Sequence, residues 1–146
     1  MVGFGFDIHR LAEGESMILG GVEIESKIGT VAHSDGDVLL HALMDALLGA
    51  AGLGDIGEHF PDTDMKYKKA NSMELTKIVV ELLESQNYKI VNIDCTLNLE
   101  KPKISKYKEQ MRNNIANVCK IPAQRVNIKA TTNEKLGFVG RAEGIT

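Results

Sequence analysis

Apolar residues crowd the segment from 37 to 51, DVLLHALMDALLGAA, on nearly every side of the helix that their spacing predicts. Three ionisable residues interrupt this helix at intervals of four: Asp37, His41 and Asp45. With a turn of about 100° per residue, their side chains fall within about 80° of one another. They form one narrow polar stripe on an otherwise apolar helix, and such a stripe faces solvent, a subunit interface or a functional site.

A second helix, amphipathic in pattern, is predicted to begin at Asn71, with Glu74 three residues later completing a capping box. Its apolar stripe consists of Leu75, Ile78, Val79, Leu82 and Leu83. The preceding segment, residues 52–69, contains three glycines, one proline and three aspartates and has no apolar period. A connection of this length inside a compact domain is typical of a lid or a binding loop, or else of a disordered segment.

Alternation of apolar and polar residues predicts strands elsewhere in the chain. Residues 91–99 alternate over nine positions, and residues 126–130 alternate again after a third helix expected at 105–119. Together they form a β-α-β unit whose crossover should be right-handed.

Two short β-prone segments lie near the N-terminus. Residues 2–9 predict a strand, and residues 17–25 predict a bent strand or hairpin because Gly20 and Gly21 interrupt them. We expect an α+β fold, or a mixed α/β fold, in which a single sheet carries helices packed on one face. No linker, repeat or change of composition divides the chain, so residues 1–146 are expected to form one domain.

Composition limits the class of protein. With 146 residues, 43% of them hydrophobic, the chain has enough apolar surface for one core. A formal charge of -3 gives no support to nucleic-acid binding or to binding at a membrane surface. No apolar run approaches the ~20 residues that cross a bilayer, and polar residues at positions 7, 9 and 10 fall where a signal peptide has its apolar centre.

The two cysteines indicate a reducing compartment. Cys95 and Cys119 have neither the spacing of a disulfide framework nor that of a metal knuckle, so they are expected to be small core residues. We therefore expect a cytoplasmic location, or a plastid-type organelle if a leader has been removed.

All four histidines lie in the first 59 residues, and two of them stand beside aspartates at spacings that suit a metal. In an extended strand, Asp7 and His9 project from the same face about 6.5 Å apart. His41 of the polar stripe can supply a third ligand. Two nitrogens and one carboxylate suit Zn²⁺ with its fourth position open, the pattern of catalytic zinc. Each histidine alone is more often a surface or core residue than a ligand.

Three further segments carry polar groups that could bind a ligand. In HSDGD, Ser34 or Asp35 is the expected N-cap, beside His33, and the free N–H groups of the helix start could hold a phosphate. This segment could equally be a plain N-cap. The acids of residues 55–64 could bind sugar hydroxyls or an ion, or could keep the loop solvated. The polar residues of segment 129–141 follow a predicted strand. Polar groups at the end of a strand favour the opening of a ligand-binding site.

Three stretches, FDIHR, AHSDGDVLLHALMDALLGAAGLGDIGEHFPDTD and IKATTNEKLGFVGRAEGI, together resemble the 2-C-methyl-D-erythritol 2,4-cyclodiphosphate synthase family of the non-mevalonate isoprenoid route. The match runs in order along nearly the whole chain. The resemblance implies a homotrimeric zinc enzyme with active sites between neighbouring subunits and a single catalytic domain. The implied reaction converts 4-diphosphocytidyl-2-C-methyl-D-erythritol 2-phosphate to the cyclic diphosphate and CMP.

The same resemblance assigns site residues by matching positions. It makes Asp7, His9 and His41 the zinc ligands and Glu134 a ligand of Mg²⁺ or Mn²⁺, with His33 and Thr132 as catalytic donors to developing charge. The residues expected to bind substrate are Ser34, Asp55, Ile56, Gly57, Phe60, Pro61, Asp62, Thr63, Asp64, Leu99, Glu100, Lys101, Pro102, Lys103, Ile104, Ser105, Thr131 and Asn133. Phe138 and Arg141 match positions that line the family's central channel, where an isoprenoid diphosphate can bind.

The sequence departs from the family at three places. Asn133 breaks the family's run of threonines, Glu100 and Lys101 replace small residues, and the family's C-terminal strand is expected to be missing after Thr146. Two other functions stay open: a zinc phosphohydrolase that uses a metal-bound water, and a non-catalytic trimer that binds a nucleotide or an isoprenoid diphosphate.

Overall fold

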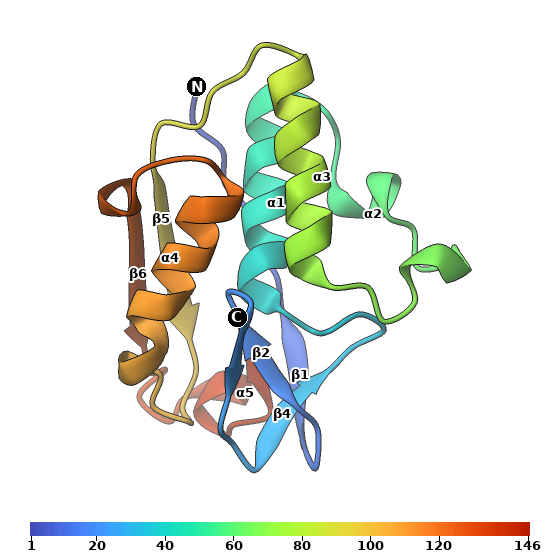
Figure 1. The fold of residues 1–146 in the computed structure, drawn as a ribbon. Helices are drawn as coiled ribbons and strands as arrows, with labels where there is room; N and C mark the ends of the chain where they lie inside the picture. The colour runs from blue at the N-terminus through green and yellow to red at the C-terminus, as the bar shows by residue number, and fades with distance from the viewer.

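The computed structural model describes residues 1–146 (Figure 1). Its strands are β1 (His9–Glu13), β2 (Met17–Leu19), β3 (Val22–Ile24), β4 (Ile28–Val31), β5 (Ile93–Asn98), β6 (Val126–Thr131) and β7 (Gly144–Ile145). The α-helices are α1 (Val38–Ala51), α2 (Ile56–His59), α3 (Ser72–Ser85), α4 (Lys108–Val118) and α5 (Gly137–Gly140). Three 3₁₀ turns, η1 (Met65–Tyr67), η2 (Ser105–Tyr107) and η3 (Ala123–Arg125), complete the order.

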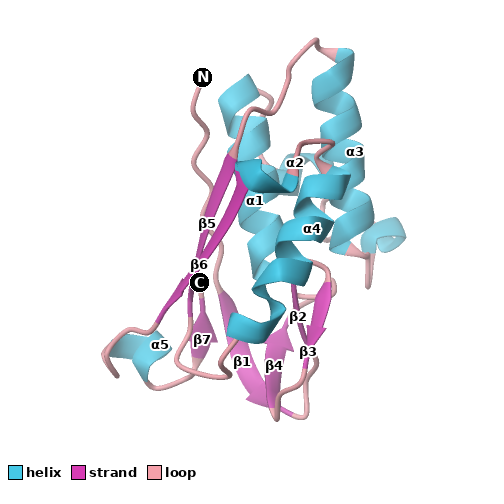
Figure 2. Cartoon of the chain, turned by 60° about the vertical axis from the view of Figure 1, so that its left-hand side comes forward, coloured by secondary structure: helices cyan, strands magenta, loops and turns pink.

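The strands form three small sheets, so the expectation of a single sheet is wrong. Their orders are β4-β1-β7, β2-β3 and β5-β6. The strand pairing does not continue from one sheet to the next because the strands are short. β7 has only two residues, and the chain after it meets β5 at one point, where Asn98 and Thr146 exchange backbone hydrogen bonds of 2.8 and 3.1 Å. The sheets therefore lie next to one another without a continuous ladder. The α/β character and the helical cover are as expected, since α1, α3 and α4 lie to one side of β5 and β6 (Figure 2).

The β-α-β unit and the hairpin follow their predictions. β5 and β6 are parallel, in register from Ile93 with Val126 to Asn98 with Thr131, and α4 connects them. β2 and β3 form an antiparallel hairpin whose turn is Gly20 and Gly21, at φ 56° and 70°. Positive φ favours glycine, which explains why this pair interrupts the β pattern.

The N-terminal segment differs from its prediction. Of the strand expected at residues 2–9, only His9 joins a sheet, and the residues before it have no strand partner. This segment lies directly on α1 instead. A Cβ on Gly3 would collide with the carbonyl of Ala46, and a Cβ on Gly5 with that of Ala42. The two glycines thus permit a backbone-to-backbone approach that carries Asp7 towards α1.

The two long helices, α1 and α3, are capped at their N-termini by side-chain oxygens, one from a carboxylate and one from an amide. The N-cap of α1 is Asp37, whose Oδ1 accepts from Leu40 N at 3.1 Å, so the assignment of Ser34 or Asp35 as N-cap is wrong. The Asp35 side chain instead binds the start of α3, where its Oδ2 accepts from Ser72 N at 2.8 Å. Asn71 caps α3 as predicted, accepting from Met73 N at 2.8 Å.

Two apolar clusters form the core. The larger has 22 buried residues, most of them from the strands, α1 and α4, and the smaller has Met44, Leu48, Leu75, Val79 and Leu83 between α1 and α3. These two helices pack side by side (Figure 1). No helix combines the length and the hydropathy that spanning a bilayer would require.

Candidate functional site

Asp7, His9 and His41 lie together, although 32 residues separate the two histidines. Asp7 comes from the N-terminal segment, His9 from the start of β1 and His41 from the first turn of α1. The three atoms Asp7 Oδ2, His9 Nε2 and His41 Nδ1 form a triangle with every side 3.1 Å. Ligand atoms on a tetrahedral zinc are about 3.3 Å apart, since the bonds are about 2.0–2.1 Å, so this donor set fits such an ion.

The three groups perturb one another's protonation. Burial works to raise the pKa of Asp7, but hydrogen bonds from His41 and His9 and the charge of His9 outweigh it, so the pKa lies below its usual range. Burial acts to lower the pKa of His41. The hydrogen bond to Asp7 and the negative charge of Asp7 raise this pKa by more than burial lowers it, so it lies above its usual value of 6.5. Without a metal, this triangle favours a proton on His41, which a bound cation would replace.

Behind the triangle, the other nitrogen of His41 meets two hydroxyl groups. Its Nε2 lies 3.0 Å from Ser72 Oγ and 3.3 Å from Ser34 Oγ. Ser72 Oγ in turn donates to Asp35 Oδ1 at 2.5 Å. No local pattern indicates this contact, because Ser72 follows an ordinary helix cap and meets Asp35 only through the packing of α3 on α1.

The other members of the polar stripe have structural partners. Asp37 is fully buried and accepts from Gly20 N at 3.0 Å and from Gly21 N at 2.8 Å in addition to its cap bond, which joins the β2–β3 turn to α1. Burial raises the pKa of Asp37 to about 6, although these N–H groups act to lower it. Asp45 Oδ1 accepts from Ile56 N at 2.9 Å and so holds the start of α2.

The segment 52–71, here called the lid segment, contains α2 and η1 and lies beside α1 and α3 (Figure 1). Asp55 caps α2 through Glu58 N at 3.0 Å, Asp64 caps η1 through Lys66 N at 2.9 Å, and the ring of Phe60 packs edge-on against Tyr67. Ile56 and Pro61 are half-buried, whereas Gly57, Asp62 and Thr63 are exposed.

The end of the lid segment is joined to the loop that carries His33 and Ser34. Lys69 N donates to His33 O at 3.0 Å, and Asp35 N donates to Ala70 O at 3.3 Å. Ser34 lies beside the triangle through His41, while the His33 side chain is exposed. The His33 side chain is thus open to solvent, one residue before Ser34.

A second group of predicted residues gathers where β5 and β6 end. Leu99 N donates to Thr131 O at 3.0 Å, which joins the two following loops. Leu99 and Ile104 are buried in the core, Glu100 and Pro102 are half-buried, and Lys101, Lys103, Ser105, Thr131, Thr132 and Glu134 are exposed. The exposed members form a polar rim at this edge of the sheet.

Two of the family departures contact each other in this group. Glu100 accepts from Asn133 N at 3.2 Å and from Lys135 N at 3.3 Å. The Asn133 side chain accepts from Asn98 Nδ2 at 3.0 Å and donates to Leu136 O at 2.9 Å. The oxygen and the nitrogen of the Asn133 side-chain amide thus both have hydrogen-bond partners within this chain.

Phe138 and Arg141 lie on and just after α5. Phe138 is 39% exposed. Arg141 forms a two-point pair with Glu143, Nε to Oε1 at 3.0 Å and Nη2 to Oε2 at 3.1 Å.

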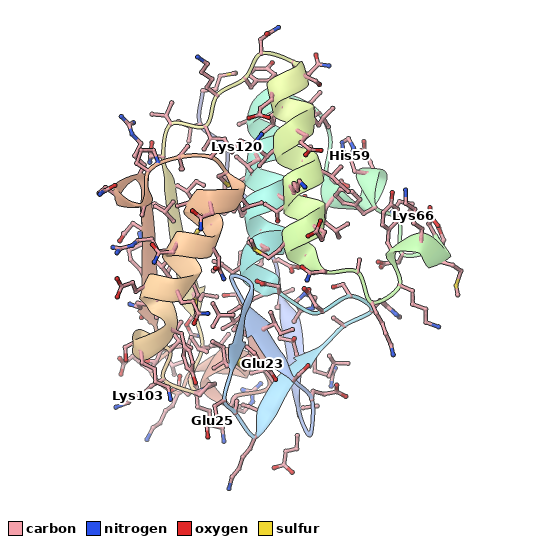
Figure 3. All side chains as sticks on the ribbon, in the orientation of Figure 1. Glu23, Glu25, His59, Lys66, Lys103 and Lys120 are labelled. Carbon is pink, nitrogen blue, oxygen red and sulfur yellow. The ribbon has the colours of Figure 1, made fainter.

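Within one chain the two groups are not joined. No hydrogen bond links the triangle, the His33 loop or the lid segment to residues 99–105 or 131–134. In Figure 3, His59 and Lys66 of the lid segment lie on the opposite side of the molecule from Lys103. One chain alone therefore does not bring all the predicted site residues together.

Comparison with protein-family models matches residues 1–146 to the YgbB family. Two relatives named 2-C-methyl-D-erythritol 2,4-cyclodiphosphate synthase, from Chlorobaculum tepidum and Symbiobacterium thermophilum, are 60% and 58% identical to this chain. The first alignment covers 98% of this chain and 91% of the relative, and the second covers 99% and 92%.

Solved structures are similar in fold as well as in sequence. A bifunctional IspDF from Campylobacter jejuni matches with a TM-score of 0.94 and 51% identity over 99% of this chain, which corresponds to 39% of that longer protein. A 2C-methyl-D-erythritol-2,4-cyclodiphosphate synthase described as a CDP-bound form matches with a TM-score of 0.92 and 35% identity, covering 99% of this chain and 94% of that one.

Proposed function

This chain belongs to the YgbB family, and on that premise we propose that its site closes the ring of 4-diphosphocytidyl-2-C-methyl-D-erythritol 2-phosphate and releases CMP. It is an enzyme of the non-mevalonate isoprenoid route, a cyclising lyase, and residues 1–146 act as one catalytic domain. The observation that carries this proposal is the triangle of Asp7, His9 and His41 in a chain of this family.

The reaction is an in-line displacement at phosphorus. An oxygen of the 2-phosphate attacks the β-phosphorus, and the bond from that phosphorus to the bridging oxygen of the α-phosphate breaks. CMP leaves with the electron pair. The attacking oxygen is already anionic at neutral pH, so no side chain is needed as a strong base. The protein must instead hold two anionic groups together in line, and orientation of this kind contributes roughly 7–11 kcal/mol in favourable cases.

Asp7, His9 and His41 would hold a divalent cation, which we propose to be Zn²⁺, because two imidazole nitrogens and one carboxylate suit it. Bound there, the ion would draw charge from phosphoryl oxygens as a Lewis acid. Glu134, exposed at the rim of the second group, is the proposed ligand of Mg²⁺ or Mn²⁺ on the diphosphate.

The remaining residues bind and orient the substrate. His33 and Thr132 are exposed and are proposed to donate hydrogen bonds to developing negative charge, with Ser34 on the phosphorylated end. The lid segment, held at its start by Asp45 and at its end by the His33 loop, covers the erythritol portion and excludes water. The exposed members of residues 99–105, Lys101, Lys103 and Ser105, receive the cytidine together with the backbone of this loop, and the CDP bound in a related structure supports a cytidine ligand.

The complete site requires a neighbouring subunit, and we propose a homotrimer. A row of apolar side chains, Val2, Phe4, Phe6 and Ile8, is exposed along the N-terminal segment, and Leu136 is exposed before α5. Apolar surface of this extent marks an interface. In the assembly, residues 99–105 and 131–134 of one subunit would face the triangle of the next. Phe138 and Arg141 would line a central channel that admits an isoprenoid diphosphate.

We also propose a cytoplasmic location. Cys95 and Cys119 are buried and unpaired, and burial raises their pKa values to about 11 and about 12, so they are inert thiols suited to a reducing compartment.

The decisive experiment is incubation with the cytidine diphosphate substrate and Mg²⁺, followed by mass analysis of the products. Cyclic diphosphate with CMP is expected, and His41→Ala should remove activity and bound zinc together. Release of inorganic phosphate would indicate a phosphohydrolase instead. Binding without turnover would indicate a non-catalytic module.

A further inference from the structure

Asp35, Ser72 and His41 form a chain of hydrogen bonds behind the metal triangle. Ser72 is fully buried, and its hydroxyl lies between Asp35 Oδ1 at 2.5 Å and His41 Nε2 at 3.0 Å. Ser72 N also donates to Asp35 Oδ2 at 2.8 Å, so both carboxylate oxygens face the same residue. This geometry leaves little freedom in the placement of the protons.

The direction of each bond follows from the donors available. A carboxylate accepts hydrogen bonds, and a serine hydroxyl has one proton, which Ser72 gives to Asp35. Ser72 Oγ therefore has only lone pairs to offer His41. These bonds therefore favour a proton on Nε2 of His41, whereas the Asp7 carboxylate, 3.1 Å from Nδ1, favours a proton on Nδ1 until a cation occupies that side.

Ser34 does not replace Ser72 in this arrangement. Its Oγ is farther from His41 Nε2, at 3.3 Å, and it already accepts from Gly36 N at 3.2 Å. The proton of Ser34 is unassigned and remains free for a ligand.

We infer that Asp35 and Ser72 are positioning residues that fix His41 in the tautomer a metal requires. This inference rests on the metal site proposed above. Partners of this kind behind a ligating histidine typically change metal affinity by about 10- to 100-fold. Because Ser72 is the first residue of α3, the same bonds also tie the orientation of the His41 ring to the end of the lid segment.

The test compares Ser72→Ala with Thr76→Val in the full chain. Thr76 is a fully buried residue one turn along the same helix, but its hydroxyl donates to Ser72 O and forms no hydrogen bond with His41. In zinc titrations against a competing chelator, Ser72→Ala should bind about 10- to 100-fold more weakly than the wild type. Thr76→Val should bind zinc like the wild type.

A second readout follows the proton directly. Long-range ¹H–¹⁵N spectra of the metal-free chain at a pH where His41 is neutral should show a larger share of the Nε2-protonated tautomer in the wild type than in Ser72→Ala, because Ser72 no longer competes with Asp7 for the proton in the variant. Asp35→Asn should shift the proton further towards Nδ1, because its amide can donate to Ser72 Oγ and turn the hydroxyl proton towards Nε2. Asp35→Asn provides the same test if Ser72→Ala does not fold. Ser72→Thr keeps a hydroxyl at this position and should restore the affinity for zinc.

The outcomes separate the two proposals. If the wild type does not bind zinc, the proposed metal site is wrong. If the wild type binds zinc but Ser72→Ala or Asp35→Asn binds it equally well and keeps the wild-type share of Nε2-protonated His41, the positioning role is wrong and the metal site stands.

Discussion

At the scale of single residues, the polar stripe on α1 divides into three separate tasks. His41 belongs to the metal triangle, Asp37 joins the β2–β3 turn to the helix start, and Asp45 holds the start of α2. The regular spacing predicted that the three share one face. It could not predict their partners, because each partner comes from a different part of the chain.

The metal-free chain should lose stability as the pH rises from about 6 to about 8. The pKa of folded His41 is raised above its unfolded value of 6.5, so its contribution is complete below that pH and is lost as the pH passes the folded pKa. The pKa of Asp7 is lowered, so its contribution is complete above the unfolded value of 3.8 and is lost only as the pH falls into strong acid. Urea unfolding of the metal-free chain at both pH values measures the change.

Asp7→Asn is the control for this pH dependence, because it removes the charge that raises the pKa of His41. The variant should lose much less stability than the wild type between the two pH values. An equal loss in both proteins would assign the effect to other groups. Zinc affinity should rise with pH over the same range, since the ion displaces the proton.

Asp37→Asn should lower the free energy of unfolding by about 1–3 kcal/mol. Three backbone N–H groups point at the two carboxylate oxygens, and an amide nitrogen in place of one oxygen leaves a buried donor unpaired. Asp45→Asn is the matched control, since Asp45 accepts a single backbone bond that an amide oxygen can keep. Denaturant unfolding of both variants at neutral pH tests this, and equal losses would contradict it.

At the scale of elements, the contact between the N-terminal segment and α1 decides whether the metal triangle forms. Gly5→Ala should weaken zinc binding by about tenfold or more, because its Cβ would meet the rigid backbone of α1 and displace Asp7 and His9. Gly49→Ala is the control: Gly49 lies on α1 with nothing near its Cβ position, and alanine there should stabilise the helix by about 0.5–1 kcal/mol. Unchanged zinc affinity in Gly5→Ala would contradict the role of this contact.

The elements also mark the limit of what local pattern predicts. Period-two alternation identified β5 and β6, because one face of each is buried, and glycines at positive φ explain the β2–β3 hairpin. Residues 2–8 share the β-prone composition but gain their contacts from α1, which is distant in the sequence, and no local pattern contains such contacts. The Asp35–Ser72 contact escaped prediction for the same reason.

At the scale of the whole molecule, the exposed apolar row of the N-terminal segment should hold subunits together. A Phe4→Ser, Phe6→Ser double variant should dissociate into folded monomers and lose activity, since these side chains are 85% and 60% exposed in the single chain. Light scattering after gel filtration measures the mass. Met65→Ser removes an exposed apolar residue of the lid segment and should leave the oligomer intact. A double variant that keeps the wild-type mass would place the interface elsewhere.

The metal triangle also has a topological consequence. Asp7 and His41 are 34 residues apart in the sequence. One ion bound to both would therefore close the chain between them, which includes β1 to β4, into a loop. Such closure acts like a reversible cross-link, removing conformational freedom from the unfolded chain. Because residues 1–8 have no strand partner, chelation should release this end first. Zinc occupancy would then control how readily a protease trims the N-terminus, independently of catalysis.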